Sequence, residues 1–193
     1  NKDIFKVEHL INKKKRSELK NQKPLCIWLT GISASGKSTL AINLEKKLTE
    51  KNMHCYVLDG DNLRQGINKD LGFEAKDREQ VTFRIGEISR LMVDAGLIVI
   101  VACISPFNKE REKLKQRFEK DEFFEIHLNT PLEECIKRDP KKLYIKAKNN
   151  SSINNIGIGG LYENPENPFL RIDTSKISLK ESVNMLIKKI FGN

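Results

Sequence analysis

The chain has 193 residues, of which 38% are hydrophobic and 32% charged, and this length is typical of one domain. An excess of lysine and arginine over aspartate and glutamate gives a formal net charge of +9, which favours an anionic partner. Residues 1–23 alone carry eight basic and three acidic side chains. We therefore expect a basic N-terminal arm over residues 1–23 and one domain over residues 24–193.

The composition argues against a membrane or secreted protein. The longest apolar run, residues 97–104, has eight residues, whereas a membrane-spanning helix needs about 18 or more. The first residues show no apolar core of a signal peptide. The four cysteines form no C-x-x-C pair, which argues against a zinc site. We expect a cytoplasmic protein that binds neither membranes nor nucleic acid.

Short apolar runs alternate with segments of helical periodicity. Several runs are apolar on both faces, which is typical of parallel strands covered by helices on both sides. Leucines at 40, 44 and 48 and apolar residues within 85–92 and 179–190 have helical spacing. This alternation predicts an α/β fold of three layers around a mostly parallel five-stranded sheet, with the ligand at the carboxyl ends of the strands. The predicted strands are residues 25–30, 54–59, 97–103, 123–128 and 169–173.

Two segments interrupt the alternation. Residues 1–23 are polar and basic, and we expect a mobile arm or one short helix there. Residues 140–168 are rich in Lys, Asn, Ser, Gly and Pro and show little periodicity. A loop of this length inside a compact domain is usually functional, and often it is a lid.

A phosphate-binding loop follows the first predicted strand. Residues 31–38 match G-x-x-x-x-G-K-[ST] and lead into the helix expected near Thr39. In such a loop the backbone N–H groups point at phosphate oxygens, the lysine reaches the β- and γ-phosphates, and the hydroxyl after it binds Mg²⁺. The expected nucleotide-binding residues are Gly31, Ile32, Ser33, Ala34, Ser35, Gly36, Lys37, Ser38 and Thr39.

Two carboxylates follow the second predicted strand. Asp59 and Asp61 are one residue apart, at a strand end that faces the phosphate loop. In phosphoryl transfer one carboxylate can bind Mg²⁺ while the other accepts the proton of an acceptor hydroxyl, and the sequence does not divide these roles. We assign both carboxylates to catalysis together with Lys37, and Ser38 and Asp59 to the metal. Arg64 and Arg78 can hold an anionic acceptor.

From these residues onward the sequence resembles the adenylylsulfate (APS) kinase family of P-loop nucleotide kinases. The resemblance includes Tyr-Val-Leu-Asp-Gly-Asp-Asn-Leu-Arg at 56–64, Gly-Ile-Asn-Lys-Asp-Leu-Gly-Phe at 66–73 and Tyr-Glu-Asn-Pro-Glu-Asn-Pro at 162–168. It extends in one register from about residue 22 to Thr174. It implies transfer of the γ-phosphoryl group of ATP to the 3′-hydroxyl of adenylylsulfate, giving 3′-phosphoadenylylsulfate in sulfate assimilation. It also implies Mg²⁺, a homodimer and a possible functional link to ATP sulfurylase.

The resemblance also assigns residues around the acceptor. It implies that Phe73 stacks on the acceptor adenine, that Ile104 and Ser105 lie beside the acceptor, and that a lid spans about residues 138–163. The serine is often labelled a phosphoserine intermediate, but a serine without an adjacent base is a poor nucleophile. We therefore expect Ser105 to contribute to catalysis by binding the acceptor. The lid would contribute Arg138 to the nucleotide and Lys141 and Leu143 to the acceptor.

Four positions depart from the family pattern, all near the acceptor. Val81 and Phe83 replace the usual Asn and Arg, and Ile153 and Asn155 replace a Lys and a Phe. Simple sequence drift is one explanation. The alternatives are a kinase for a different nucleotide, for example a cytidine diphosphate derivative, and a catalytically silent regulatory partner of ATP sulfurylase.

Overall fold

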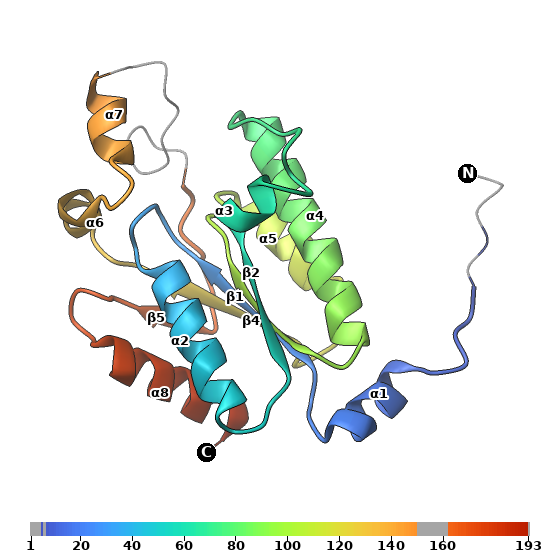
Figure 1. The fold of residues 1–193 in the computed structure, drawn as a ribbon. Coiled ribbons are helices and arrows are strands. Elements are labelled where there is room, and N and C mark those ends of the chain that lie inside the picture. The colour runs from blue at the N-terminus through green and yellow to red at the C-terminus, as the bar shows by residue number, and fades with distance from the viewer. Residues whose placement is uncertain (1–4, 6, 150–161, 193) are drawn as a thin grey trace.

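The computed structural model describes residue 5, residues 7–149 and residues 162–192. Five parallel strands form one sheet in the order β2-β3-β1-β4-β5 (Figure 1). This confirms the α/β fold, and every strand lies within a run that the sequence predicts. The strands are β1 (Leu25–Thr30), β2 (Cys55–Asp59), β3 (Ile98–Ala102), β4 (Phe123–Leu128) and β5 (Leu170–Ile172).

Helices cover both faces of the sheet, as the two-sided apolar runs predict. On β1, Leu25, Ile27 and Leu29 belong to a core shared with one pair of helices, while Cys26 and Trp28 belong to a second core on the opposite face. All five side chains are at most 2% exposed. The first core includes α2 (Lys37–Thr49) and α8 (Leu179–Phe191), and the second includes α4 (Ala75–Asp94) and α5 (Asn108–Lys115).

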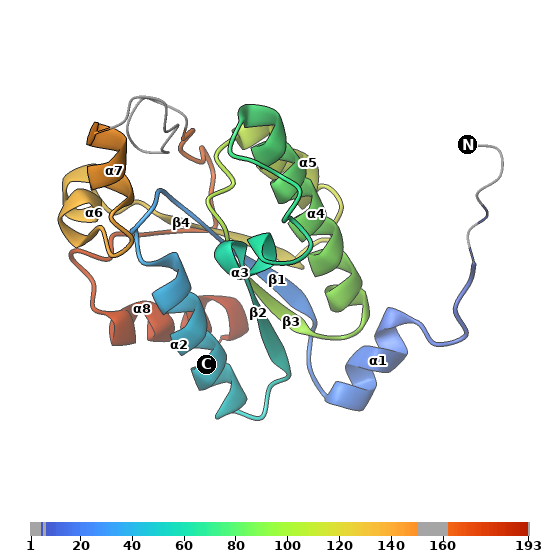
Figure 2. The same ribbon diagram turned by 45° about the horizontal axis from the view of Figure 1, so that its top comes forward.

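Three short helices surround the carboxyl ends of the strands. Figure 2 shows α6 and α7 on one side of these strand ends and α4 with α5 on the other. Among the described residues, no helix combines the length and apolar character that crossing a bilayer requires. The three short helices are α3 (Gly60–Arg64), α6 (Leu132–Arg138) and α7 (Leu143–Asn149).

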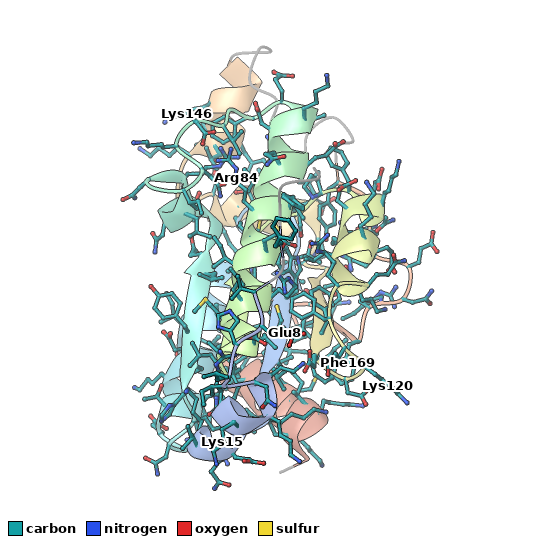
Figure 3. All side chains as sticks on the ribbon, turned by 90° about the vertical axis from the view of Figure 1, so that its right-hand side faces the viewer. Glu8, Lys15, Arg84, Lys120, Lys146 and Phe169 are labelled. Carbon is teal, nitrogen blue, oxygen red and sulfur yellow. The ribbon has the colours of Figure 1, made fainter. Side chains whose placement is uncertain are left out.

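Part of the basic N-terminal segment is a helix, α1 (Lys13–Lys20), that packs on the domain. Lys13 forms ion pairs with Glu119 and Glu122, and Arg16 forms one with Asp94. After the helix, the Gln22 amide donates to the carbonyls of His54 and Gly96, which precede β2 and β3. The helix therefore lies at the amino ends of the strands. Figure 3 likewise places Lys15 of α1 at the opposite end of the molecule from Arg84.

Candidate active site

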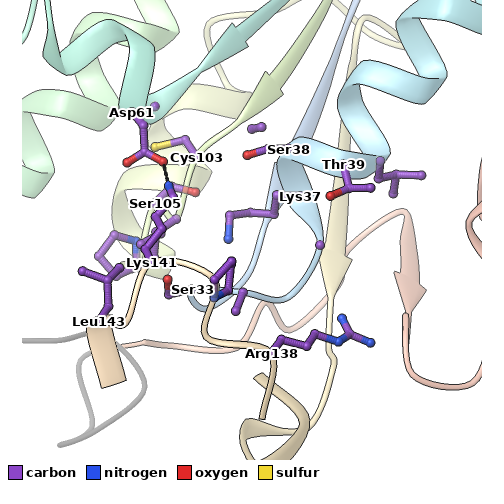
Figure 4. A pocket seen from close by; sticks show the side chains of 18 of the residues that line it. Ser33, Lys37, Ser38, Thr39, Asp61, Cys103, Ser105, Arg138, Lys141 and Leu143 are labelled. Carbon is purple, nitrogen blue, oxygen red and sulfur yellow. Dashed lines mark hydrogen bonds and ion pairs between the residues drawn. The ribbon is translucent and has the colours of Figure 1, made fainter. Parts of the chain in front are cut away.

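A pocket of about 940 Å³ lies at the carboxyl ends of the strands. It brings together residues from the phosphate loop, α3, α4, the segment after β3, and α6 with α7 (Figure 4). Most of the site residues predicted from the sequence line this pocket: Ser33, Ala34, Gly36, Lys37, Ser38, Thr39, Asp61, Arg64, Phe73, Arg78, Ile104, Ser105, Arg138, Lys141 and Leu143. Gly31, Ile32, Ser35 and Asp59 do not line it.

The pocket also contains residues that the predicted site does not include. Thr174 joins the phosphate loop to α6, because its Oγ1 donates to the Ser35 carbonyl at 3.0 Å and accepts from Arg138 Nη1 at 2.7 Å. Tyr144 on α7 donates from its hydroxyl to the Ser33 carbonyl at 2.9 Å. Thr174 could have been found from the sequence, because it follows the fifth apolar run and strand ends converge on the ligand.

Two glycines shape the phosphate loop. Gly31 and Gly36 have φ angles of 154° and 99°, in a region that side chains disfavour. A Cβ atom on Gly31 would lie 2.7 Å from the Leu128 carbonyl oxygen, so the loop also packs too closely on β4 for a side chain. Gly36 caps α2, which begins at Lys37, two residues before the predicted start. The loop backbone therefore stands at the helix N-terminus, where phosphate is favoured.

Lys37 is almost fully buried beneath the loop. Its ammonium group donates to the carbonyls of Gly31 at 2.9 Å and Ile32 at 2.7 Å. Burial lowers the Lys37 pKa to about 8, although the neighbouring Asp61 carboxylate opposes this shift. The positive charge of Lys37 is therefore held inside the loop, although its removal from water is unfavourable.

Ser38 and Asp59 meet at the start of α2. The Ser38 hydroxyl donates to Asp59 Oδ2 at 2.6 Å, and Asp59 Oδ1 accepts from the backbone N–H of Asp61 at 2.9 Å. Asp59 therefore both caps α3 and presents an oxygen beside the phosphate loop. A hydroxyl and a carboxylate next to a triphosphate site suit Mg²⁺, which takes few protein oxygens and keeps phosphate and water ligands.

Asp61 and Lys141 form an ion pair across the pocket (Figure 4). Asp61 belongs to α3, and Lys141 to the turn between α6 and α7. Both side chains are more than half exposed. One of the two carboxylates that we assign to catalysis therefore meets the lysine of the predicted lid at the open side of the pocket.

Two arginines lie close to the ring of Phe73, which also lines the pocket. The Arg64 guanidinium carbon lies 4.3 Å from the ring centroid, and that of Arg78 lies 5.5 Å away. Arg64 also donates to the Leu71 and Gly72 carbonyls, and Arg78 to the Phe73 carbonyl. Burial lowers the pKa of Arg78, and the nearby Arg64 charge adds to this effect. Phe73 remains 60% exposed, so an exposed aromatic surface lies close to two cations.

Ser105 is only 2% exposed. Its hydroxyl accepts from Trp28 Nε1 at 2.9 Å and donates to Thr30 Oγ1 at 3.1 Å. The residue has a φ of 40°, which is uncommon for a side chain other than glycine. With both hydrogen bonds made inside the protein, this arrangement does not support a nucleophilic serine.

The four departures from the family pattern have different surroundings. Val81 is buried and lines the pocket. Phe83 does not line it; its ring is 47% exposed and lies 5.8 Å from the Arg117 guanidinium carbon. Phe83 therefore adds no aromatic surface to the acceptor side. Ile153 and Asn155 lie outside the described residues, as does the part of the predicted lid between residues 150 and 161.

Comparison with known proteins agrees with this geometry. The family model described as adenylylsulphate kinase matches residues 23–173. The adenylyl-sulfate kinase of Shewanella pealeana is 48% identical over 185 residues, covering 96% of this chain and 90% of that protein.

Solved structures give the same result. The Mycobacterium tuberculosis APS kinase CysC in complex with AMPPNP and APS has a TM-score of 0.83 and 40% identity, covering 88% of this chain and 98% of that chain. The hexameric APS kinase from Thiobacillus denitrificans has a TM-score of 0.66 and 26% identity, covering 93% of this chain and 31% of that chain. The family model and the Shewanella relative confirm the resemblance: the chain belongs to the adenylylsulfate kinase family.

Proposed function

We propose that the protein transfers the γ-phosphoryl group of ATP to the 3′-hydroxyl of adenylylsulfate, giving 3′-phosphoadenylylsulfate. One observation carries this proposal: a single pocket joins Lys37 of a phosphate loop, the carboxylate of Asp61 and the ring of Phe73 with two arginines close to it. Identity of 48% to an adenylyl-sulfate kinase over most of both chains supports this acceptor. It does not favour a different nucleotide acceptor or a catalytically silent partner.

The donor side consists of the phosphate loop and α2. The loop backbone and the N-terminus of α2 would bind the phosphates, with the Lys37 ammonium at the transferred group. Arg138 lies beside the loop through Thr174 and would contact the nucleotide. Ser38 and Asp59 would hold Mg²⁺, which supplies charge neutralisation for the phosphates.

On the acceptor side, Asp61 would accept the proton of the 3′-hydroxyl. The adenine would stack on Phe73, and Arg64 and Arg78 would bind the anionic part of the acceptor. Lys141 would exchange its ion pair with Asp61 for a contact to the acceptor, and Leu143 would pack beside it. Ser105 would act through its backbone rather than as a nucleophile, because direct in-line transfer needs only positioning and charge stabilisation.

The cellular setting follows from the same family membership. We place the protein in the cytoplasm, in sulfate assimilation, as a homodimer with a functional link to ATP sulfurylase. The hexameric relative from Thiobacillus denitrificans supports self-association within this family. Size-exclusion chromatography with light scattering tests the dimer directly.

A coupled assay of ADP release tests the reaction. We expect turnover with adenylylsulfate that saturates at micromolar concentrations and requires ATP and Mg²⁺. Cytidine and other nucleoside diphosphates serve as competing acceptors. Activity with a cytidine nucleotide and none with adenylylsulfate would contradict the proposal, and no activity with any acceptor would favour the regulatory role.

A further inference from the structure

A buried arginine outside the pocket organises the pocket wall. Arg111 on α5 is 2% exposed and is not among the residues that line the pocket. Its Nε donates to Glu125 Oε1 on β4 at 2.7 Å, and Glu125 is also buried. This ion pair balances the charge of the guanidinium and uses only one of its N–H groups. The remaining N–H groups of the planar guanidinium can donate to several other acceptors at once.

These remaining donors join two segments distant in the sequence. Arg111 Nη1 donates to the Ser105 carbonyl, and Nη2 donates to the Glu163 carbonyl at 2.7 Å. The two segments also pair directly, because the Glu163 N–H donates to the Pro106 carbonyl at 2.9 Å. The guanidinium carbon further lies 5.6 Å from the centroid of the Tyr162 ring. Arg111 therefore contacts both sides of one junction.

The segment that Arg111 holds is the pocket wall itself. Ile104, Ser105 and Pro106 all line the pocket, and Ser105 adopts the left-handed φ of 40°. Such a conformation persists only where its surroundings fix it. Here Trp28 and Thr30 hold the side chain of Ser105, whereas Arg111 holds its carbonyl.

Tyr162 adds a second link in the same network. Its hydroxyl lies 3.0 Å from Thr30 Oγ1, and Thr30 Oγ1 donates to the Ile104 carbonyl at 2.7 Å. The wall is thus fixed at two successive carbonyls, of Ile104 and Ser105, by groups that also contact residues 162 and 163.

We propose that Arg111 is a positioning residue for the phosphoryl acceptor: its fork to the Ser105 and Glu163 carbonyls sets the backbone of residues 104–106 at the acceptor side of the pocket. The inference rests on the proposed function for its kinetic consequence, but the positioning itself can be observed without any substrate. Loss of the fork lowers kcat/KM for adenylylsulfate and leaves ATP binding unchanged, because Arg111 makes no hydrogen bond to residues 31–38 of the phosphate loop.

The test replaces the whole ion pair. In the double variant Arg111→Met/Glu125→Met, no buried charge is left unpaired, and such apolar replacements are commonly tolerated. The matched control is Glu125→Gln, which disturbs the same pair but leaves the Arg111 donors to both carbonyls. Since a 1 Å misplacement of reacting groups costs about 100-fold in rate, we expect kcat/KM for adenylylsulfate to fall about 10- to 100-fold in the double variant. The control should stay close to the wild-type value.

Trp28 supplies the readout that does not depend on activity. It is the chain's single tryptophan, and its indole N–H donates to the Ser105 hydroxyl. Glu125 is the register partner of Trp28 on the neighbouring strand, so a change at Glu125 acts on the Trp28 emission directly. If Arg111 positions Ser105, the emission maximum of the folded double variant therefore shifts beyond that of Glu125→Gln. Circular dichroism confirms that both variants are folded, and binding of AMPPNP measures the donor side.

The outcomes separate the two claims. A Trp28 shift beyond that of Glu125→Gln, with selective loss of acceptor kcat/KM, supports the positioning role. A shift no larger than that of Glu125→Gln, or an equal loss of AMPPNP and acceptor affinity, overturns it. If the wild-type protein does not phosphorylate adenylylsulfate, the proposed function fails, while the Trp28 comparison still decides whether Arg111 sets the wall.

Discussion

Lys141 forms an ion pair with Asp61, 80 residues earlier in the chain, and so joins the predicted lid to the proposed catalytic carboxylate. Because both side chains are more than half exposed, water screens the pair and it contributes little to stability. A substrate can therefore displace Lys141 at small cost. The pair keeps Lys141, which we propose binds the acceptor, beside the proposed catalytic carboxylate.

Replacing Asp61 with Asn tests the proton acceptor. Asn keeps the size of the side chain but cannot take a proton, so we expect kcat to fall about 100- to 10,000-fold. The affinity for AMPPNP should change little, because Asp61 accepts no hydrogen bond from the phosphate loop in this structure. The measurement is steady-state ADP release together with AMPPNP titration.

Asp121→Asn is the matched control, because Asp121 is exposed and lies in the turn before β4, outside the pocket. Its φ of 61° suits Asn, so this variant should behave as the wild type. Normal turnover in Asp61→Asn would transfer the proton-acceptor role to Asp59.

The lowered pKa of Lys37 predicts how ATP binding depends on pH. Four groups act on this pKa besides burial: the thiols of Cys103 and Cys135, the Asp61 carboxylate and the Lys141 ammonium. The pKa values of both thiols are raised by burial. As pH rises through about 8, free protein loses the Lys37 charge, so AMPPNP affinity should fall by up to about tenfold per pH unit, since binding favours the charged form. Titration calorimetry from pH 7 to 9.5 measures this trend.

The same pKa has the opposite effect on folding. The Lys37 pKa is about 8 in the folded chain and 10.5 in the unfolded chain, so between these values the unfolded chain binds more protons. The Lys37 contribution to the free energy of unfolding therefore rises with pH in this window. Lys37→Met should abolish both the pH dependence of AMPPNP affinity and the Lys37 contribution to the pH dependence of unfolding. If AMPPNP affinity depends on pH in Lys37→Met as in the wild type, Lys37 is not the group responsible.

The sequence predicts the sheet and the phosphate loop because both depend on local patterns. Strands buried on both faces have few polar residues, and the loop needs Gly31, Gly36 and Lys37 at fixed spacing. The docking of α1 was not predictable, because it depends on ion pairs from Lys13 and Arg16 to residues far along the chain.

The parts of the candidate site that the sequence did not predict depend on the directions of side chains. No pattern in the sequence shows that the Ser105 hydroxyl meets Trp28 and Thr30, since that requires the packing of β1 against the segment after β3. The direction of the Phe83 side chain, by contrast, could have been predicted from the sequence. It lies two residues after Val81 on α4, and two residues rotate a helix by about 200°, so both side chains cannot face the same pocket.

Replacing Phe73 tests the acceptor side. Phe73→Leu removes the stacking surface but keeps an apolar side chain, and stacking of a base on an aromatic ring contributes about 1–3 kcal/mol. We expect the KM for adenylylsulfate to rise about 5- to 150-fold while AMPPNP affinity stays constant. Phe83→Leu is the control, because that ring lies outside the pocket. An equal rise in KM in the control would show that the effect does not come from stacking.

Gly86 tests the packing of α4 on α5. Replacing a glycine within a helix by alanine normally raises the free energy of unfolding by about 1 kcal/mol. Here a Cβ atom on Gly86 would lie 2.2 Å from Leu114 Cδ1, and Leu114 is buried. Overpacking of this kind typically costs about 1–3 kcal/mol, so Gly86→Ala should lower the free energy of unfolding measured in urea.

Two further variants make the origin of this effect clear. Leu114→Val shortens the side chain that clashes. Gly86→Ala should therefore lower the free energy of unfolding less in the Leu114→Val variant than in the wild type. Gly66→Ala is the control, because a Cβ atom there meets nothing within 4 Å, and it should be neutral or slightly stabilising. If Gly86→Ala is more stable than the wild type, Leu114 can move aside, and close contact between α4 and α5 does not require glycine at this position.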